Sequence, residues 1–233
     1  MLDNWQTLAR RWAEQYTVIL VDQRNHGRSP HTEEHTYPLM ANDLMEFMGF
    51  KGIYEANILG HSMGGKTAMQ FAQYHPEMVN KLVVVDIAPK IYQAGHNVIF
   101  EALTRFPLQD ITDRKAANEW LAGRIPEASV RQFLLKNLSR DKNTGGYRWK
   151  MNLPVLQDHY QDVLLNIEEG EVFEEPTLFV RGGKSHYVQD EDILTILDLF
   201  LNSRVETIAE AGHWVHAEQP DALFQIVSDF LAE

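Results

Sequence analysis

Ser62 lies at the centre of the segment 60–65, GHSMGG, which matches the pattern G-x-S-x-G. The apolar run 57–59 precedes it and a helical pattern continues to about Tyr74, which predicts a strand, a sharp turn and a helix. Glycines allow close packing at such a turn, which strains the serine backbone and lifts its hydroxyl above the sheet edge. We therefore expect Ser62 to be a nucleophile and the N–H of Met63 to contribute to an oxyanion hole.

A serine hydroxyl needs a general base, and His213 is the preferred one. It follows Gly212 in the stretch between the last predicted strand and the last predicted helix. A loop at this place can bring an imidazole over the carboxyl edge of the sheet. His216, three residues later, is the nearest rival, and we interpret it as a surface or core residue.

The carboxylate that would orient the histidine has more than one candidate. Asp86 ends the predicted strand that follows the nucleophile strand in the chain, whereas Asp190 and Asp192 follow the predicted strand 177–181. Both locations lie at the carboxyl edge of the expected sheet, and an aspartate at a strand end is often only a cap. The residue types and their positions therefore leave the choice open.

The elements that must position these residues alternate between strands and helices, which predicts an α/β fold with a mostly parallel sheet flanked by helices. The 233 residues suffice for one such domain. The expected strands are 17–21, 57–59, 81–87, 177–180 and 205–209. The strand at 17–21 is expected to be buried on both faces. The expected helices are 3–13, 36–49, 62–74, 191–201 and a last one that contains residues 222–230.

The alternation stops between about residues 92 and 175, where four short amphipathic patterns occur and no convincing strand. We interpret this region as a helical cap inserted between two strands of an α/β core formed by 1–91 and 176–233. The expected helices of the cap are 97–105, 113–123, 127–138 and 155–165.

Composition narrows the range of partners. The net charge of −12 argues against binding to nucleic acid or to an anionic membrane surface. The chain has no cysteine, which excludes disulfides and thiolate metal sites, and no metal site is expected. The absence of cysteine is also compatible with the reducing cytoplasm, where we expect the protein to be located. No apolar stretch approaches the roughly 20 residues that span a bilayer, and the N-terminus does not resemble a secretory signal.

Four segments together resemble one branch of the α/β-hydrolase superfamily, the small YbfF-like esterases and acyl-thioesterases. They are 22–29 (DQRNHGRS), 60–65 (GHSMGG), 86–89 (DIAP) and 212–218 (GHWVHAE), in the order found in that branch. The similarity runs over nearly the whole chain. It implies a serine hydrolase with a helical cap, no cofactor, and a small-molecule ester or thioester as substrate.

The resemblance also bears on the acid. Many superfamily members carry it in a G-x-x-D turn after the strand 177–181, but here that turn ends in Ser185. In YbfF-like proteins the acid follows the preceding strand, which corresponds to Asp86. The resemblance therefore favours Asp86 over Asp190 and Asp192.

In that branch a His-Gly loop and three strands precede the segment that resembles residues 2–5. The loop supplies a second oxyanion donor, and the third strand lies between those corresponding to 17–21 and 57–60. This chain begins after them, so we expect one donor, from Met63, and a gap in the sheet.

The leading hypothesis is hydrolysis of carboxylic esters or thioesters by Ser62, His213 and Asp86. Expected substrate-binding residues are His61, Trp149, Tyr160 and Trp214, with Trp120 and Phe133 as further candidates for the pocket wall. A carbon–carbon bond hydrolase, a cofactor-free haloperoxidase, and a ligand-binding protein with little turnover are the alternatives.

Overall fold

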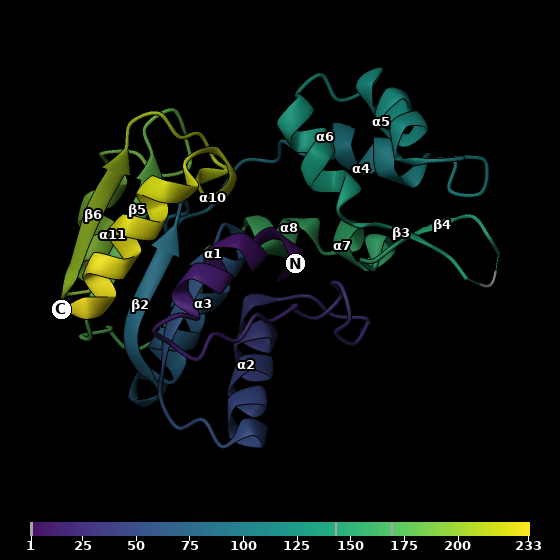
Figure 1. Ribbon diagram of the computed structural model, residues 1–233. Coiled ribbons are helices and arrows are strands. Elements are labelled where there is room, and N and C mark those ends of the chain that lie inside the picture. The colour runs from purple at the N-terminus through teal and green to yellow at the C-terminus, as the bar shows by residue number, and fades with distance from the viewer. Residues whose placement is uncertain (1, 143, 169) are drawn as a thin grey trace. The chain divides into compact units, whose positions relative to one another are not determined.

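The computed structural model describes residues 2–142, 144–168 and 170–233, which form two compact units. Residues 5–20, 36–92 and 163–233 form the first, which we call the sheet unit. Residues 2–4, 21–35 and 93–162 form the second, which we call the insertion unit. The blue, green and yellow strands of the sheet unit and the teal helices of the insertion unit can be followed in Figure 1.

The sheet unit contains four parallel strands, as the alternating pattern predicts. They lie in the order β1-β2-β5-β6, and their bounds are β1 (Ala56–His61), β2 (Val79–Val85), β5 (Thr177–Gly182) and β6 (Ser203–Ile208). Because all four run in the same direction, their carboxyl ends gather at one edge of the sheet. Ser62, Asp86 and Gly183 directly follow β1, β2 and β5.

Alternate residues of the strands serve two separate cores, one on each face of the sheet. Val83 and Val85 of β2 pack in one core, whereas Leu82 and Val84 pack in the other. The first core includes apolar residues of α1 (Gln6–Trp12) and α11 (Pro220–Ala232). The second includes those of α2 (Tyr37–Lys51), α3 (Met63–Tyr74) and α9 (Asp192–Leu199). The helices therefore cover both faces, as a parallel sheet requires.

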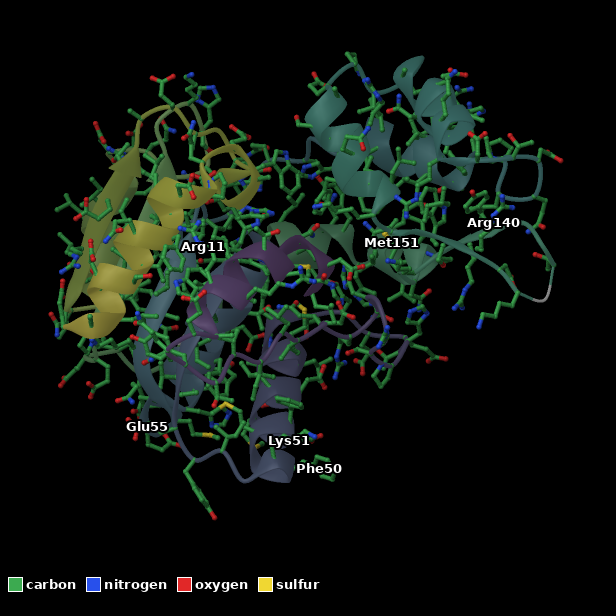
Figure 2. The ribbon with its side chains drawn as sticks, in the orientation of Figure 1. Arg11, Phe50, Lys51, Glu55, Arg140 and Met151 are labelled. Atoms are coloured by element: carbon green, nitrogen blue, oxygen red, sulfur yellow. The ribbon has the colours of Figure 1, made fainter. Side chains whose placement is uncertain are left out.

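Two further short helices complete the unit, and they are η2 (Pro76–Met78) and α10 (Val215–Glu218). Arg11 of α1, labelled in Figure 2, contacts two residues of α11. Its guanidinium lies 3.7 Å from the ring centroid of Phe224, and Nη1 lies 2.7 Å from a carboxylate oxygen of Asp221. Arg11 thereby links α1 to α11.

The prediction of a buried strand at 17–21 is wrong. These residues form no strand, and the side chains of Ile19 and Val21 are 47% and 43% exposed. A strand requires a neighbouring backbone with which to exchange hydrogen bonds. In the sheet of the described chain, β1 pairs with β2 alone, so the β-branched run 17–21 has no ladder to join.

The insertion unit is mainly helical and has its own hydrophobic core. Its elements are η1 (Leu2–Asn4), α4 (Asn97–Thr104), α5 (Arg114–Ala122), α6 (Ala128–Leu135), β3 (Leu138–Arg140), β4 (Tyr147–Trp149) and α7 (Leu153–Asp158), and α8 (Tyr160–Leu164) leads out of it. Its core is built from residues between Ala102 and Leu153. The helices expected at 97–105, 113–123 and 127–138 are confirmed, whereas the pattern at 155–165 is divided between α7 and α8.

The expectation that this region contains no strand is wrong. β3 and β4 pair as an antiparallel hairpin in which Leu138 lies opposite Trp149. Each strand has only three residues, which is too short for a period of two to be recognised in the sequence. The cap at 92–175 therefore stays a prediction, while the structure defines the insertion unit as a compact body that also contains the short segments 2–4 and 21–35.

The close approach of β1 and α3 generates a stability prediction. A Cβ on Gly60 would lie 2.1 Å from the carbonyl oxygen of Gly64, an overlap that only a backbone shift can relieve. Overpacking of this kind costs about 1–3 kcal/mol, and each kcal/mol lowers Tm by about 2–4 °C in a chain of this size. We expect Gly60→Ala to lower the midpoint of thermal unfolding, measured by circular dichroism, by several degrees.

Gly49→Ala is the matched control, since a Cβ at Gly49 would meet nothing within 4 Å. Gly49 lies in α2, where alanine is the better helix former, so Tm should stay the same or rise. Equal Tm values for Gly60→Ala and Gly49→Ala would contradict the close approach of β1 and α3.

Candidate active site

Ser62 occupies the turn between the last residue of β1, His61, and the first residue of α3, Met63. Its backbone has φ 54° and ψ −124°, a region that L-residues rarely adopt and that costs on the order of 1–3 kcal/mol. Gly60 and Gly65 allow β1 and α3 to approach, because a Cβ on Gly60 would lie 2.1 Å from the carbonyl oxygen of Gly64 and one on Gly65 would lie 3.2 Å from that of Gly60. The strained turn expected from the glycine pattern is therefore present.

Three side chains from separate loops form a continuous hydrogen-bonded series. His213 Nε2 lies 3.0 Å from Ser62 Oγ, and His213 Nδ1 lies 2.8 Å from Asp86 Oδ2. The Asp86 side chain is fully buried and that of His213 is 17% exposed. An imidazole held between a hydroxyl and a carboxylate in this way can accept the hydroxyl proton, since the carboxylate offsets the resulting positive charge.

Asp86 is fixed by donors from the neighbouring strand and turn. Its backbone φ is 50°, and its Oδ1 accepts a hydrogen bond of 2.9 Å from the N–H of Gly182 at the end of β5. The hydroxyl of Ser185 donates to Oδ2 at 2.5 Å, the same oxygen that binds His213. In the sequence Ser185 stands out only as a departure from an acid position, and nothing there signals its contact with Asp86.

The two alternative carboxylates bind other cations. Asp190 lies 2.7 Å from Arg181 Nη1, and Asp192 lies 2.5 Å from Lys90 Nζ. Asp192 also accepts a hydrogen bond from the N–H of Gln189. Of the three candidates for the acid, Asp86 is the one that hydrogen-bonds to His213.

His61 lies against the His213 loop and is half-buried, and its expected role in substrate binding stays a prediction. Its Nε2 is 2.8 Å from the backbone oxygen of His213, and its ring centroid is 4.7 Å from that of His213. Burial, with further effects of His213 and His216, holds the pKa of His61 well below its ordinary range. The neutral ring therefore donates through Nε2–H to the His213 carbonyl, which orients the loop.

The other aromatic residues of the loop pack around these rings. His216 is 7% exposed and its ring stacks on Trp5 at 4.8 Å. The ring of Trp214 lies 5.2 Å from that of His213. Glu218 accepts hydrogen bonds from the N–H groups of Gly212 and Trp214, which closes the loop on both sides of His213. The expected substrate contact of Trp214 stays a prediction.

The ring of Tyr187, a residue not predicted from the sequence, stacks on the imidazole of His213. The two centroids are 3.8 Å apart and the planes differ by 18°. The Tyr187 carbonyl accepts a hydrogen bond of 2.7 Å from the hydroxyl of Tyr92. An aromatic residue near the expected acid turn was the one hint in the sequence that Tyr187 could lie close to His213. Stacking between residues far apart in the chain leaves no recognisable sequence pattern.

The expected oxyanion donor, Met63, is the first residue of α3. Its N–H belongs to the helix N-terminus, where the partial positive charge of the helix favours a developing negative charge. This location is compatible with the expected role, which stays a prediction.

The expected pocket residues Trp149 and Tyr160 belong to the insertion unit. The indole N–H of Trp149 donates to the carbonyl of Leu103, and its ring packs 5.0 Å from that of Phe106 in the hydrophobic core. Trp120 and Phe133 pack against the same core. The substrate-binding roles of these residues stay predictions.

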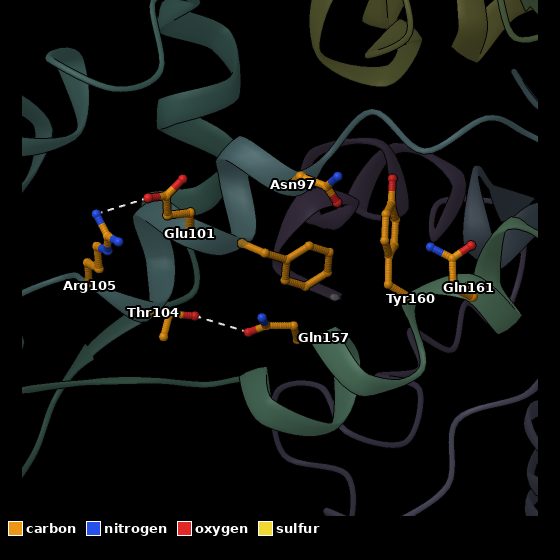
Figure 3. Close-up of a pocket in the computed structure, with 8 residues that line it drawn as sticks. Asn97, Glu101, Thr104, Arg105, Gln157, Tyr160 and Gln161 are labelled. Atoms are coloured by element: carbon orange, nitrogen blue, oxygen red, sulfur yellow. Dashed lines mark hydrogen bonds and ion pairs between the residues drawn. The ribbon is translucent and has the colours of Figure 1, made fainter.

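Tyr160 borders a cavity of about 420 Å³ in the insertion unit, shown in Figure 3. Its hydroxyl accepts hydrogen bonds of 3.0 Å from the N–H groups of Gly95 and His96, which fixes the ring at the edge of the cavity. The cavity is lined by Asn97, Phe100, Glu101, Thr104, Arg105, Gln157, Tyr160 and Gln161. Its walls are therefore mostly polar.

No metal site is evident in residues 2–142, 144–168 and 170–233, where no group of three or more histidine, aspartate or glutamate side chains is arranged to hold an ion. In the same part of the chain, no helix is both long and apolar enough to cross a membrane.

Comparison with known proteins identifies the family. The model of the alpha/beta hydrolase fold matches residues 1–220. The chain belongs to the α/β-hydrolase family. It is 37% identical to Esterase YbfF of Escherichia coli, over 99% of this chain and 88% of that protein. It is 38% identical to sn-1-specific diacylglycerol lipase ABHD11 of Xenopus laevis, over 98% of this chain and 75% of that protein.

A solved structure described as a marine microorganism esterase agrees with this α/β-hydrolase chain at a TM-score of 0.94. The two sequences are 39% identical, and the match covers 98% of this chain and 90% of the other. The expected resemblance to YbfF-like proteins and the α/β-hydrolase fold are therefore confirmed. The chain is a hydrolase of this family.

The low pKa of His61 predicts a dependence of stability on pH. In the unfolded chain an imidazole takes up a proton near pH 6.5, whereas folded His61 takes it up only at much lower pH. The free energy of unfolding should therefore fall as the pH is lowered from 7 to 5, by up to about 1.4 kcal/mol per pH unit for each such histidine. Burial also lowers the pKa of His26 to about 4 and that of His35 to about 3, with the same sign.

His61→Gln separates the contribution of His61, because glutamine can still donate to the His213 carbonyl but does not titrate. Urea unfolding at pH 7, 6 and 5 should show the variant losing less stability than the wild type as the pH falls, by about 1 kcal/mol between pH 6.5 and 5.5. Parallel pH dependences for the two proteins would contradict a depressed pKa at His61.

Proposed function

We propose that the chain is a serine hydrolase that cleaves carboxylic esters through an acyl-enzyme on Ser62. The observation that carries the proposal is the hydrogen-bonded series from Ser62 Oγ through His213 to Asp86, with distances of 3.0 and 2.8 Å. The strained backbone of Ser62 adds support, since it presents the hydroxyl at the end of the sheet. The names of the relatives, an esterase and a diacylglycerol lipase, support esters as the substrate class.

In the first half of the reaction, Ser62 Oγ attacks the acyl carbonyl carbon and His213 Nε2 accepts the hydroxyl proton. Asp86 stabilises the resulting imidazolium through Nδ1–H and keeps the ring in the required tautomer. The carbonyl oxygen becomes an oxyanion, for which the N–H of Met63 at the start of α3 is the proposed donor. Collapse of this intermediate breaks the bond to the alcohol oxygen, which takes the proton from Nε2.

In the second half, a water molecule replaces the alcohol. His213 accepts a proton from this water as it attacks the acyl carbon, and then returns the proton to Ser62 Oγ as the acid departs. The imidazole must therefore stay in one plane and one tautomer through both halves. A thioester would follow the same steps with a thiol as leaving group, and the choice between the two stays a prediction.

Replacement of the nucleophile is the first test. Ser62→Ala should lower the turnover of a short-chain nitrophenyl ester by about 10⁴-fold or more, because residual catalysis after loss of a triad member comes only from binding and the oxyanion hole. Ser62→Ala should also abolish labelling by a fluorophosphonate. Ser228→Ala is the control, since the Ser228 hydroxyl accepts a hydrogen bond from Trp12 Nε1 and should be dispensable for turnover. A Ser62→Ala protein with a tenth of wild-type activity would exclude the mechanism.

The identity of the acid is the second test. An amide at position 86 can present its NH₂ group to the imidazole and so favour the wrong tautomer, an effect of about 10⁴-fold on kcat in a reference hydrolase. We expect Asp86→Asn to lower kcat by about 10³–10⁴-fold. Asp190→Asn and Asp192→Asn, which alter carboxylates bound to Arg181 and Lys90, should stay within a few-fold of wild type. If Asp86→Asn were nearly active and Asp192→Asn inactive, the assignment of the acid to Asp86 would be wrong.

A further inference from the structure

We propose that Tyr187 is a positioning residue for the imidazole of His213, and that Tyr92 holds Tyr187 in place from the segment through which the chain leaves the sheet unit. The inference rests on the proposed function, in which His213 is the general base. It concerns how the imidazole plane is kept fixed while the proton is transferred. All of the residues involved belong to the sheet unit.

The stacked pair is close enough to restrict the imidazole. A centroid separation of 3.8 Å and an interplanar angle of 18° place the phenol ring in van der Waals contact with the imidazole face. Rotation of the imidazole about its Cβ–Cγ bond would drive it into the phenol ring, so the plane stays aligned with Ser62 and Asp86. An aromatic face also attracts a cation within about 6 Å, which favours the imidazolium that forms during the reaction.

The backbone of Tyr187 is held on both sides. Its N–H donates to Ser185 Oγ at 3.2 Å, and Ser185 in turn donates to Asp86. Its carbonyl accepts the hydroxyl of Tyr92 at 2.7 Å. That hydroxyl also accepts a hydrogen bond of 2.8 Å from the N–H of Ala88, two residues after Asp86. Tyr187 is thus fixed relative to the segment that carries the catalytic carboxylate.

The hydroxyl of Tyr92 is suited to this role because it remains protonated. Burial raises the pKa of Tyr92 well above its ordinary value, so the O–H is available as a donor to the Tyr187 carbonyl across the working range of pH. The rings of Tyr92 and Tyr187 also pack against each other with centroids 5.3 Å apart. The side chain of Tyr92 therefore supports Tyr187 through both a hydrogen bond and ring packing.

Tyr92 is the last residue of the sheet unit before the insertion, and the chain returns at Val163. The leaving and returning segments are held side by side, because the N–H of Tyr92 donates to the Leu164 carbonyl at 2.9 Å. The buried ammonium of Lys66 donates to the carbonyls of Lys90 and Leu165. The segment that carries Tyr92 is therefore held in place by hydrogen bonds of its own, and the Tyr92 hydroxyl is the group that connects it to Tyr187.

The ring of Tyr187 is tested by two substitutions that differ in aromaticity. Tyr187→Leu removes the stacked face and should lower kcat for a nitrophenyl ester by about tenfold while KM stays within about twofold. Tyr187→Phe keeps the face and should retain most of the wild-type kcat. The rate of fluorophosphonate labelling of Ser62 should follow kcat in both variants, since it reports the activation of the hydroxyl without substrate turnover.

The link from Tyr92 is tested with a matched pair of phenol deletions. Tyr92→Phe removes the hydroxyl that binds the Tyr187 carbonyl and should lower kcat about three- to tenfold. Tyr37→Phe is the control, because its hydroxyl donates to the Val163 carbonyl at the same junction but does not bind Tyr187. Tyr37→Phe should keep the wild-type kcat. In the double variant Tyr92→Phe/Tyr187→Leu, kcat should be no lower than in Tyr187→Leu alone, since the two act through one contact.

All variants are compared at a temperature well below their measured Tm, so that loss of folded protein does not enter kcat. A wild-type kcat in Tyr187→Leu, or a Tyr187→Phe protein as slow as Tyr187→Leu, would overturn the positioning role. An equal loss in Tyr37→Phe and Tyr92→Phe would overturn the link from Tyr92. Ser62→Ala is assayed beside them: if it keeps its turnover, the proposed function fails, whereas an inactive Ser62→Ala with a wild-type Tyr187→Leu rejects this inference alone.

Discussion

The buried carboxylate of Asp86 is the constraint on which the arrangement of the site depends. A charge taken out of water must be compensated by donors, or the folded state loses several kcal/mol. Here the donors come from three segments: the N–H of Gly182, the hydroxyl of Ser185 and the imidazole of His213. Satisfying one charge thus fixes the end of β5, the turn after it and the loop that carries His213.

The strained turn at Ser62 contributes a second, independent element of order. Its geometry depends on the absence of side chains at Gly60 and Gly65, and it places the hydroxyl where the imidazole of His213 can reach it at 3.0 Å. The imidazole of His213, the proposed base, is therefore held from one side by the buried carboxylate of Asp86 and from the other by the rigid turn at Ser62. The neutral ring of His61, bound to the His213 carbonyl, holds the loop between them.

Much of this could be predicted from the sequence because its signals are local or follow from strand direction. Glycine spacing around Ser62 specifies the turn, and parallel strands bring the residues that follow them to one edge. The residue types alone could not choose between Asp86 and Asp190 or Asp192, since that choice depends on the register that sets the residues after β2 beside β5. The resemblance to a known family supplied the preference instead.

The wrong and missing predictions also have specific physical causes. Residues 17–21 have the composition of a buried strand, but a strand forms only beside a neighbouring strand with which it exchanges hydrogen bonds. The composition of a segment does not show whether such a neighbour is present. The hairpin β3–β4 is too short to show a period. Ser185 and Tyr187 act on Asp86 and His213 across about 100 and 26 residues of chain, and contacts of that kind become visible only when the segments are folded together.

The hydrogen bond between Ser185 and Asp86 limits which side chains position 185 can carry. A carboxylate at position 185 would stand beside the oxygen that now binds His213, and two carboxylates so close cannot both be ionised. Either strand end could therefore supply the acid, but not both at full charge. If both positions carried a carboxylate, the pair would have to share a proton, and the hydroxyl of Ser185 is a neutral group that avoids this conflict.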